Sequence, residues 1–254
     1  MSKYALGLLA SGLATNTRLT DFFFTHNNLE EFEDAGKTFL KSFENKRELR
    51  SLALNSCNMN NNLLLELQSA IQDHTKLQEL YLFANKINSD GAKHISAIIK
   101  NKSFLSSIGL SNNKLYKAGA VEIADNGLKG KNQLVKISIE NNSIGNEGLQ
   151  AISHALGSCS GIQELYLYNN EIDDEPIDAF CTFLKNQSQL VALGLEFNRI
   201  GYKGLQKILE AIVDHHKLEK LYLNQNDINT QAGESLYAFI SNIKNLKELR
   251  ISNN

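Results

Sequence analysis

Apolar residues return along this chain in a short pattern, with leucine or isoleucine at the first, fourth and sixth places of a block. The segment from Leu77 to Leu82 shows it clearly. Alternation between buried and outward places over so few residues predicts a short β-strand with one buried face. Related blocks begin every 28 to 30 residues, at Leu19, Leu49, Leu77, Leu105, Leu134, Ile162, Leu190, Leu218 and Leu246. The chain is therefore predicted to be an array of nine similar units.

The ninth place of each block is polar and is almost always asparagine. An asparagine amide both donates and accepts hydrogen bonds, so it can satisfy backbone groups where the chain leaves a strand. We expect the stacked units to align these side chains into a ladder inside the turn. The ladder places are Asn27, Cys57, Asn85, Asn113, Asn142, Asn170, Asn198, Asn226 and Asn254.

The second half of each unit predicts a helix. Apolar residues recur there at helical spacing, as in Leu205, Ile208 and Ile212. A small residue or proline precedes them, 14 places after the start of the block. Proline is favoured in the first turn of a helix, so this place is expected to open it. The six residues are Gly91, Gly119, Gly148, Pro176, Gly204 and Ala232.

The two kinds of element determine the overall shape. Neighbouring strands lie roughly 4.8 Å apart, whereas packed helices need about 8–10 Å. An array with one strand and one helix in each unit must therefore curve. Residues 1–254 are predicted to form one α/β solenoid, a curved horseshoe of about nine strand units. Its parallel β-sheet lies on the concave face and its α-helices lie on the convex face.

The strand pattern L-x-x-L-x-L-x-x-N-x-I, with G-(A/L)-x-x-(I/L) at the helix start, resembles the ribonuclease-inhibitor-like class of leucine-rich repeats. The resemblance covers nearly the whole chain. The class includes ribonuclease inhibitors, sensor segments of NOD-like receptors, Ran GTPase-activating proteins and many scaffold proteins. It implies binding of another protein, usually along the concave face or its rim. The chain lacks the cysteine density of ribonuclease inhibitor and the acidic C-terminal tail of the Ran activators.

Composition narrows the possible partners. The chain has 26 Lys and Arg against 28 Asp and Glu, and its net charge of −2 gives no bulk attraction to nucleic acid or to an anionic membrane. No apolar stretch approaches the roughly 18 residues of a membrane span. Three cysteines do not make a disulfide scaffold and favour a reducing compartment. We therefore expect a cytoplasmic protein that binds another protein of unknown identity.

The start of the chain allows two interpretations. Leu6, Leu9 and Leu13 fall at the helical places of a unit that would precede the first block, which predicts an opening helix without a strand. Residues 1–14 also resemble a weak secretory signal, because Lys3 precedes an apolar run and small residues follow it. The position of the leucines in the repeat favours the helix.

The last predicted strand reaches Asn254 with no helix after it. An uncovered strand edge pairs readily with another chain. We therefore expect that the chain belongs to a longer array or that a partner contacts this C-terminal strand edge.

No group of residues has the spacing of a catalytic, metal or cofactor site. The run Asp214–His216 resembles a metal cluster, but Asp73–His74 occupies the same place in another unit, which favours a structural role at a helix end. The acidic residues of Asp173–Asp178 stand at a helix start, where the helix dipole explains them. Calcium-loop, phosphate-loop and nucleophile-elbow motifs are absent. We expect no enzyme activity, metal or cofactor.

The concave face carries the candidate binding residues. Its second, third, fifth, seventh and eighth places are expected to face outward, and Gly194 is expected to leave a notch between Tyr166 and Tyr222. Exposed aromatic residues are common anchors at protein interfaces, and acidic neighbours favour a basic group on the partner. Alternatively, the tyrosines stack on one another and stiffen the sheet. The predicted partner-binding residues are Tyr166, Tyr168, Gly194, Glu196, Phe197, Tyr222, Tyr81, Phe83 and Glu140.

Three functions fit these expectations. The first is a non-enzymatic scaffold or recognition module that binds protein through the concave face. The resemblance to Ran activators implies a second, in which the chain stimulates a GTPase by positioning the partner's own catalytic groups. The third is a sensor fragment of a NOD-like receptor, which needs a nucleotide-binding domain upstream.

Overall fold

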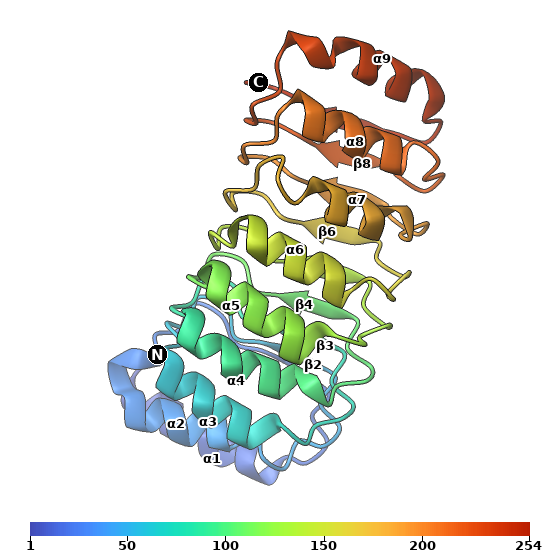
Figure 1. Cartoon of the computed structure of the whole chain (residues 1–254). Coiled ribbons are helices and arrows are strands. Elements are labelled where there is room, and N and C mark those ends of the chain that lie inside the picture. Colours follow the sequence, from blue (N-terminus) through green and yellow to red (C-terminus); the bar gives the residue numbers. More distant parts are fainter.

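A computed structural model describes all residues from 1 to 254 and contains one parallel sheet of nine strands in sequence order (Figure 1). Each strand has three residues and pairs with the strand that follows it in the chain. The strands are β1 Asp21–Phe23, β2 Ser51–Ala53, β3 Glu79–Tyr81, β4 Ser107–Gly109, β5 Lys136–Ser138, β6 Glu164–Tyr166, β7 Ala192–Gly194, β8 Lys220–Tyr222 and β9 Glu248–Arg250.

Helices form a second layer along one face of this sheet (Figure 1). One helix precedes β1, and one helix follows each strand from β1 to β8. The predicted α/β solenoid is therefore confirmed. The helices are α1 Lys3–Thr15, α2 Glu33–Lys41, α3 Asn61–Ile71, α4 Ser89–Lys100, α5 Tyr116–Ile123, α6 Gly145–Ala155, α7 Ile177–Lys185, α8 Tyr202–Ile212 and α9 Gly233–Asn242.

The apolar core lies between the two layers. From β2 to β8, the middle residue of every strand is at most 1% exposed. The predicted helical stripe is buried as well, as Leu205, Ile208 and Ile212 of α8 show. The buried apolar side chains make one cluster of 66 residues that runs from α1 to α9. Each unit therefore completes its core with side chains of its neighbours.

The opening helix is also present. Leu6, Ala10 and Leu13 of α1 are buried against the following unit. The Lys46 ammonium donates a hydrogen bond of 2.5 Å to the carbonyl oxygen of Leu13, close to the end of this helix. Residues 3–15 thus occupy the helical position of the unit that precedes β1.

The asparagine ladder forms from Asn85 onward, whereas Asn27 donates to the Thr25 carbonyl of its own turn and the Cys57 thiol donates to the Phe24 carbonyl. In Asn85, Oδ1 accepts hydrogen bonds of 3.0 Å from the backbone N–H groups of Cys57 and Met59. Its Nδ2 donates to the carbonyl oxygens of Leu54 and Leu82 at 2.9 and 3.0 Å. Each amide therefore joins the turn of the preceding unit to its own strand. The same kind of bridge recurs at Asn113, Asn142, Asn170, Asn198, Asn226 and Asn254.

The eighth place of every block is a turn, where the sequence analysis expected an outward strand position. All nine residues at this place have left-handed backbone conformations, with φ between 52° and 57°. Asparagine tolerates this conformation better than most residues. It fills the place four times, at Asn112, Asn141, Asn169 and Asn253. The eighth-place side chains therefore lie on the rim of the sheet.

The small residue 14 places into each unit opens the helix only in part of the array. Pro176 directly precedes α7, as predicted, but α4, α5, α6 and α8 begin two or three residues before their glycine. Gly91, Gly119 and Gly148 instead lie close to the preceding helix, whereas Gly204 lies against the Asp174 carboxylate of the preceding loop. A β-carbon at Gly148 of α6 would lie 2.9 Å from the β-carbon of Ala120 on α5. Close helix packing therefore accounts for the glycine at this position.

Candidate functional site

Outward side chains form rows across the concave face, because the strands pair in register. The fifth-place row contains the last residue of each strand, so that Tyr166, Gly194 and Tyr222 are successive neighbours on β6, β7 and β8. The seventh-place row lies two residues further along each unit. There, Glu140, Tyr168 and Glu196 occupy three successive units. The two rows are the surface from which the candidate site is built.

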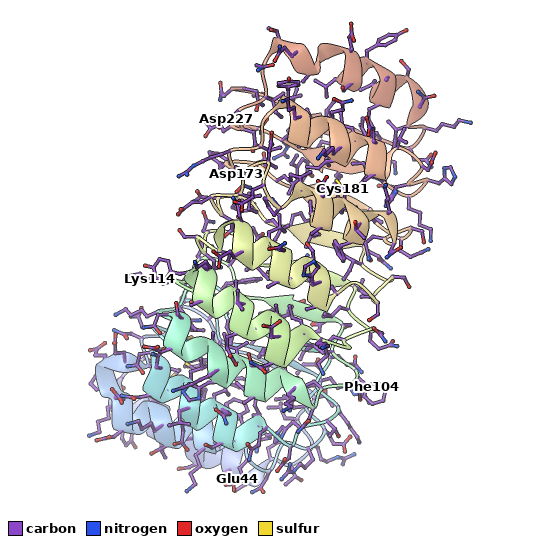
Figure 2. All side chains as sticks on the ribbon, viewed as in Figure 1. Glu44, Phe104, Lys114, Asp173, Cys181 and Asp227 are labelled. Atoms are coloured by element: carbon purple, nitrogen blue, oxygen red, sulfur yellow. The ribbon has the colours of Figure 1, made fainter.

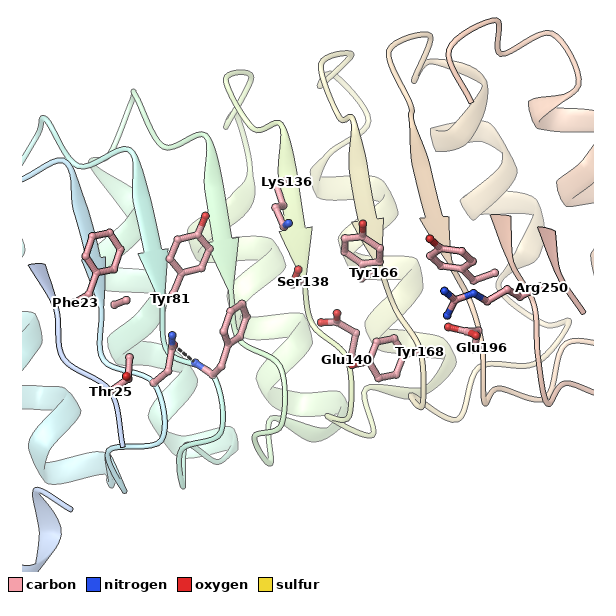
Figure 3. A pocket seen from close by; sticks show the side chains of 14 residues that line it. Phe23, Thr25, Tyr81, Lys136, Ser138, Glu140, Tyr166, Tyr168, Glu196 and Arg250 are labelled. Carbon is pink, nitrogen blue, oxygen red and sulfur yellow. Dashed lines mark hydrogen bonds between the residues drawn. The ribbon is translucent and has the colours of Figure 1, made fainter. Parts of the chain in front are cut away.

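A hollow of about 660 Å³ lies over these rows (Figure 3). Seven of the nine predicted binding residues line it, and the other two, Gly194 and Phe197, do not. The concave hollow is lined by Phe23, Thr25, Ala53, Asn55, Tyr81, Phe83, Lys136, Ser138, Glu140, Tyr166, Tyr168, Glu196, Tyr222 and Arg250.

The notch expected at Gly194 is covered by an aromatic ring. A β-carbon at Gly194 would lie 3.0 Å from Cδ1 of Tyr166, and Tyr166 supplies all the nearest atoms. The ring therefore leans over β7 toward the glycine. Because Gly194 has no side chain, the Tyr166 ring can pack against the backbone of β7. The ring fills the space that was expected to be open to a partner.

Phe197 stands on the rim of the hollow. It occupies the eighth place of its unit, with φ of 56°, and 49% of it is exposed. It is not among the residues that line the hollow. Its role in binding stays a prediction.

Two basic residues that the sequence analysis did not select are built into the hollow. Lys136 pairs with Glu164 at 2.6 Å, and its ammonium lies 5.5 Å from the ring centre of Tyr166. Both residues start their strands and neighbour each other in register on β5 and β6. The sequence could have indicated that Lys136 and Arg250 face outward, because they occupy the third and fifth places of their blocks. It could not indicate the pairing of Lys136 with Glu164, which depends on the register of the sheet.

Arg250 makes an equivalent arrangement on the last two strands. Its guanidinium lies 4.5 Å from the ring centre of Tyr222 and pairs with Glu248 at 2.6 Å. The Tyr222 hydroxyl donates a hydrogen bond of 2.9 Å to the same carboxylate. This bond and the Glu248 charge raise the pKa of Tyr222, although burial is the larger cause.

The two glutamates of the seventh-place row are hydrogen-bonded to neutral groups, and the Lys136 charge acts on Glu140 only at longer range. Glu140 is only 7% exposed, and it accepts a hydrogen bond from the Ser111 hydroxyl. Burial raises the pKa of Glu140, since water no longer stabilises its charge. Glu196 accepts a hydrogen bond of 2.6 Å from the Asn224 amide. Neither carboxylate forms a salt bridge.

Tyr168 stands between these two glutamates in the row (Figure 3). Burial is the main cause that raises the pKa of Tyr168, and the charges of Glu140 and Glu196 raise it further. The negative charges of both carboxylates therefore reach the Tyr168 side chain. The Tyr168 ring forms no stacked pair with the ring of Tyr166 or Tyr222.

The N-terminal part of the hollow is aromatic and uncharged. The rings of Tyr81 and Phe83 lie 5.5 Å apart, centre to centre. A β-carbon at Gly109 would lie 2.7 Å from Cδ1 of Tyr81 and would also collide with Phe83. These two rings therefore pack over the neighbouring glycine strand, just as Tyr166 packs over Gly194.

A row of buried donors lies at the opposite edge of the array, three places before the blocks. Lys102 donates hydrogen bonds to the carbonyl oxygens of Ile71 and Gln72 at 2.9 and 2.6 Å, where α3 ends. His215 Nε2 likewise lies 2.9 Å from the carbonyl oxygen of Leu184. The side chains that reach back in this way, the helix-end row, are Lys46, His74, Lys102, Lys131, Gln187 and His215.

The helix-end row explains the repeated Asp-His pair. Both histidines hydrogen-bond to the preceding unit, which confirms the helix-end position that the sequence predicted for them.

The acidic residues near α7 bind groups of the next unit. Asp174 accepts a hydrogen bond of 2.8 Å from Gly201 N–H, and Asp178 pairs with Lys207 at 2.7 Å. Figure 2 shows Asp173 on the loop edge that also carries Lys114 and Asp227. None of the helices is both long and apolar enough to cross a membrane.

Comparison with known proteins shows what the chain resembles. Family models described as leucine-rich repeats match residues 73–96, 131–153 and 161–183. The chain is 27% identical over 251 residues to NACHT, LRR and PYD domains-containing protein 14 of Mus musculus, across 95% of this chain and 24% of that protein. It is 23% identical over 260 residues to the ribonuclease inhibitor of Mus musculus, across 100% of this chain and 56% of the inhibitor.

A solved structure gives the same fold. An internalin of Listeria monocytogenes superposes with a TM-score of 0.55 at 18% identity, across 85% of this chain and 58% of the internalin. That likeness concerns the fold alone. The chain spans about a quarter of the NACHT protein and about half of the inhibitor.

Proposed function

We propose that this chain, whose leucine-rich repeats are similar to those of ribonuclease inhibitor, is a non-enzymatic recognition module that holds another protein on its concave face. A protein-binding role is the common property of such modules. The concave surface as the place of binding, and the absence of catalysis, are the parts that we add.

The concave hollow is the observation that carries this proposal. It brings five aromatic side chains of the predicted set onto one continuous surface, and all five are partly exposed. Aromatic side chains give large contact area at low entropic cost, and they dominate the energetics of many interfaces. The alternative role, in which stacked tyrosines stiffen the sheet, finds little support in β6 to β8. No ring pair forms among Tyr166, Tyr168 and Tyr222.

The names of the relatives support the same class of function. A ribonuclease inhibitor acts, by its name, on another protein. The β9 edge is a second surface at which a partner could bind, because this strand pairs only with β8. Contact there stays a prediction, as does stimulation of a GTPase.

The test removes two anchors of the hollow. A partner is first captured from the native source by cross-linking and identified, and its affinity for the purified chain is then measured by calorimetry. Tyr166→Ala combined with Tyr222→Ala is expected to weaken that affinity at least tenfold, because buried aromatic anchors cost about 2 kcal/mol or more when truncated. The matched control is Tyr237→Ala, which removes a tyrosine that is 76% exposed on α9.

The outcome separates the two surfaces. Unchanged affinity in the double variant would exclude the concave face as the binding surface. A loss with Tyr237→Ala alone would place the partner on the helical side.

The similarity to NACHT, LRR and PYD proteins favours one further candidate. We infer that the chain serves as the recognition segment of a larger receptor, since it aligns with about a quarter of such a protein. Immunoblotting of the native source with an antibody to these residues tests this. A band far above 28.3 kDa is expected, and a band at that mass would contradict the receptor interpretation.

A further inference from the structure

Two groups on the concave face share one composition. Each joins a tyrosine ring, a glutamate and a cation supplied by a neighbouring strand. In the first group Lys136 lies over Tyr166 and pairs with Glu164. The second group consists of Arg250, Tyr222 and Glu248. Both cations gain from the negative face of a ring and from a carboxylate together.

A third tyrosine on this face has the carboxylates and lacks the cation. Tyr168 lies between Glu140 and Glu196 in the seventh-place row, and neither glutamate forms a salt bridge. Each carboxylate is held from its outer side, Glu140 by the Ser111 hydroxyl and Glu196 by the Asn224 amide. Both donors are neutral. The three side chains, here the Tyr168 site, therefore bring two carboxylates to one ring without a salt bridge to either carboxylate.

The two cations that line the hollow are already paired. Lys136 and Arg250 line the same hollow, but each is paired with its own glutamate at 2.6 Å. The Glu140 carboxylate is desolvated at a cost in free energy, because it is 93% buried and forms no salt bridge. An incoming cation would relieve that cost, which makes binding at this point favourable.

We propose that the Tyr168 site receives an arginine side chain of the partner protein, with the guanidinium over the Tyr168 ring and hydrogen-bonded to Glu140 and Glu196. This proposal rests on the proposed function, since it names the chemistry that the concave face recognises. The hollow of about 660 Å³ exceeds the volume of one side chain. The segment that carries the arginine can therefore contact the neighbouring tyrosines as well.

Arginine suits the site better than lysine. A guanidinium is planar, stacks on aromatic rings and presents five donors, so it can serve carboxylates on two sides at once. A lysine ammonium is a compact charge with stronger hydration.

The experiment uses the full chain and three short peptides. Each peptide has glycines on both sides of one variable residue, which is arginine, lysine or citrulline, the neutral isostere of arginine. Binding is followed by NMR of the chain with labelled tyrosine. The arginine peptide is expected to shift the Tyr168 resonances at millimolar concentration, and the citrulline peptide is expected to bind at least tenfold more weakly.

Glu140→Gln combined with Glu196→Gln provides the complementary arm. Glutamine keeps the shape and can still accept the bonds from Ser111 and Asn224, but it removes both charges. This variant is expected to bind the arginine peptide at least tenfold more weakly than the native chain. Glu210→Gln, an exposed glutamate on α8, is the matched control and is expected to bind normally.

Three results would overturn the proposal: equal binding of arginine and citrulline peptides, equal binding of arginine and lysine peptides, or undiminished binding by the double glutamine variant. The captured partner separates this failure from failure of the proposed function. If its affinity falls in the Tyr166 and Tyr222 double alanine variant and is unchanged in the double glutamine variant, the concave face binds the partner without an arginine at Tyr168.

Discussion

Replacing Lys102 by methionine tests the energetics of the helix-end row. This lysine is fully buried, and its ammonium donates to the carbonyl oxygens of Ile71 and Gln72. It forms no salt bridge. Burial lowers the pKa of Lys102 from 10.5 to about 8, because the charged form loses its hydration. Methionine keeps the apolar length of the side chain and removes the ionisable group.

The sign and size of the effect follow from proton linkage. Between about pH 8 and pH 10.5 the unfolded chain binds a proton at this lysine that the folded chain does not, so stability rises with pH. A shift from 10.5 to about 8 means a cost of about 3 kcal/mol at pH 7. The same relation gives a gain of about 2.5 kcal/mol between pH 7 and pH 10. Lys102→Met is expected to lose this gain.

The assay is urea unfolding followed by far-ultraviolet circular dichroism at several pH values from 7 to 10. At pH 7 the variant is expected to lie within about 1 kcal/mol of the native chain, because the removed charge offsets the loss of two hydrogen bonds. The exposed residue Lys100 on α4 supplies the control, and Lys100→Met should keep the native pH slope. Parallel curves for native chain and Lys102→Met would refute the reasoning.

Three further perturbations are expected to change stability. Asn198→Ala should cost about 3 kcal/mol in urea unfolding, because two buried N–H groups lose their acceptor, and Asn254→Ala, whose side chain is exposed, should cost clearly less. Phe197→Asn should raise stability by about 0.5–1 kcal/mol in thermal melting, since asparagine tolerates the left-handed turn; a lower melting temperature would contradict this. Burial lowers the pKa of His74, so acidification below pH 6.5 destabilises the folded chain. His74→Gln should reduce that loss between pH 7 and pH 5, and an identical loss would argue against it.

Most of the fold could be predicted from the sequence, because the repeat makes the structurally important positions recognisable. Every position recurs nine times, so the strand anchors, the ladder asparagines and the buried helical stripe each stand out from variation at other places. The helix starts were less accessible. Gly119 and Gly148 are explained by contact with the preceding helix, and that contact depends on how closely the units stack.

The aromatic residues of the candidate site were predicted from the sequence, but the basic residues that pair with glutamates beside them were not. Tyr166 and Tyr222 stand out as large outward residues, whereas the pairing of Lys136 with Glu164 joins residues 28 positions apart in two different units. Such pairs follow only from strand register. The helix-end row was missed for a different reason: its members share a donor group while differing in residue type, and a search for identical residues overlooks them.

The asparagine ladder gives the array a direction. Oδ1 of Asn85 accepts hydrogen bonds from the N–H groups of Cys57 and Met59, which belong to the preceding unit. The Lys102 ammonium likewise donates to a carbonyl oxygen at the end of α3, also in the preceding unit. A unit therefore cannot finish its own turn, because the missing acceptor arrives with its successor. On a ribosome, where the N-terminal units emerge first, every newly made unit stays incomplete until about 28 more residues have followed it out of the exit tunnel.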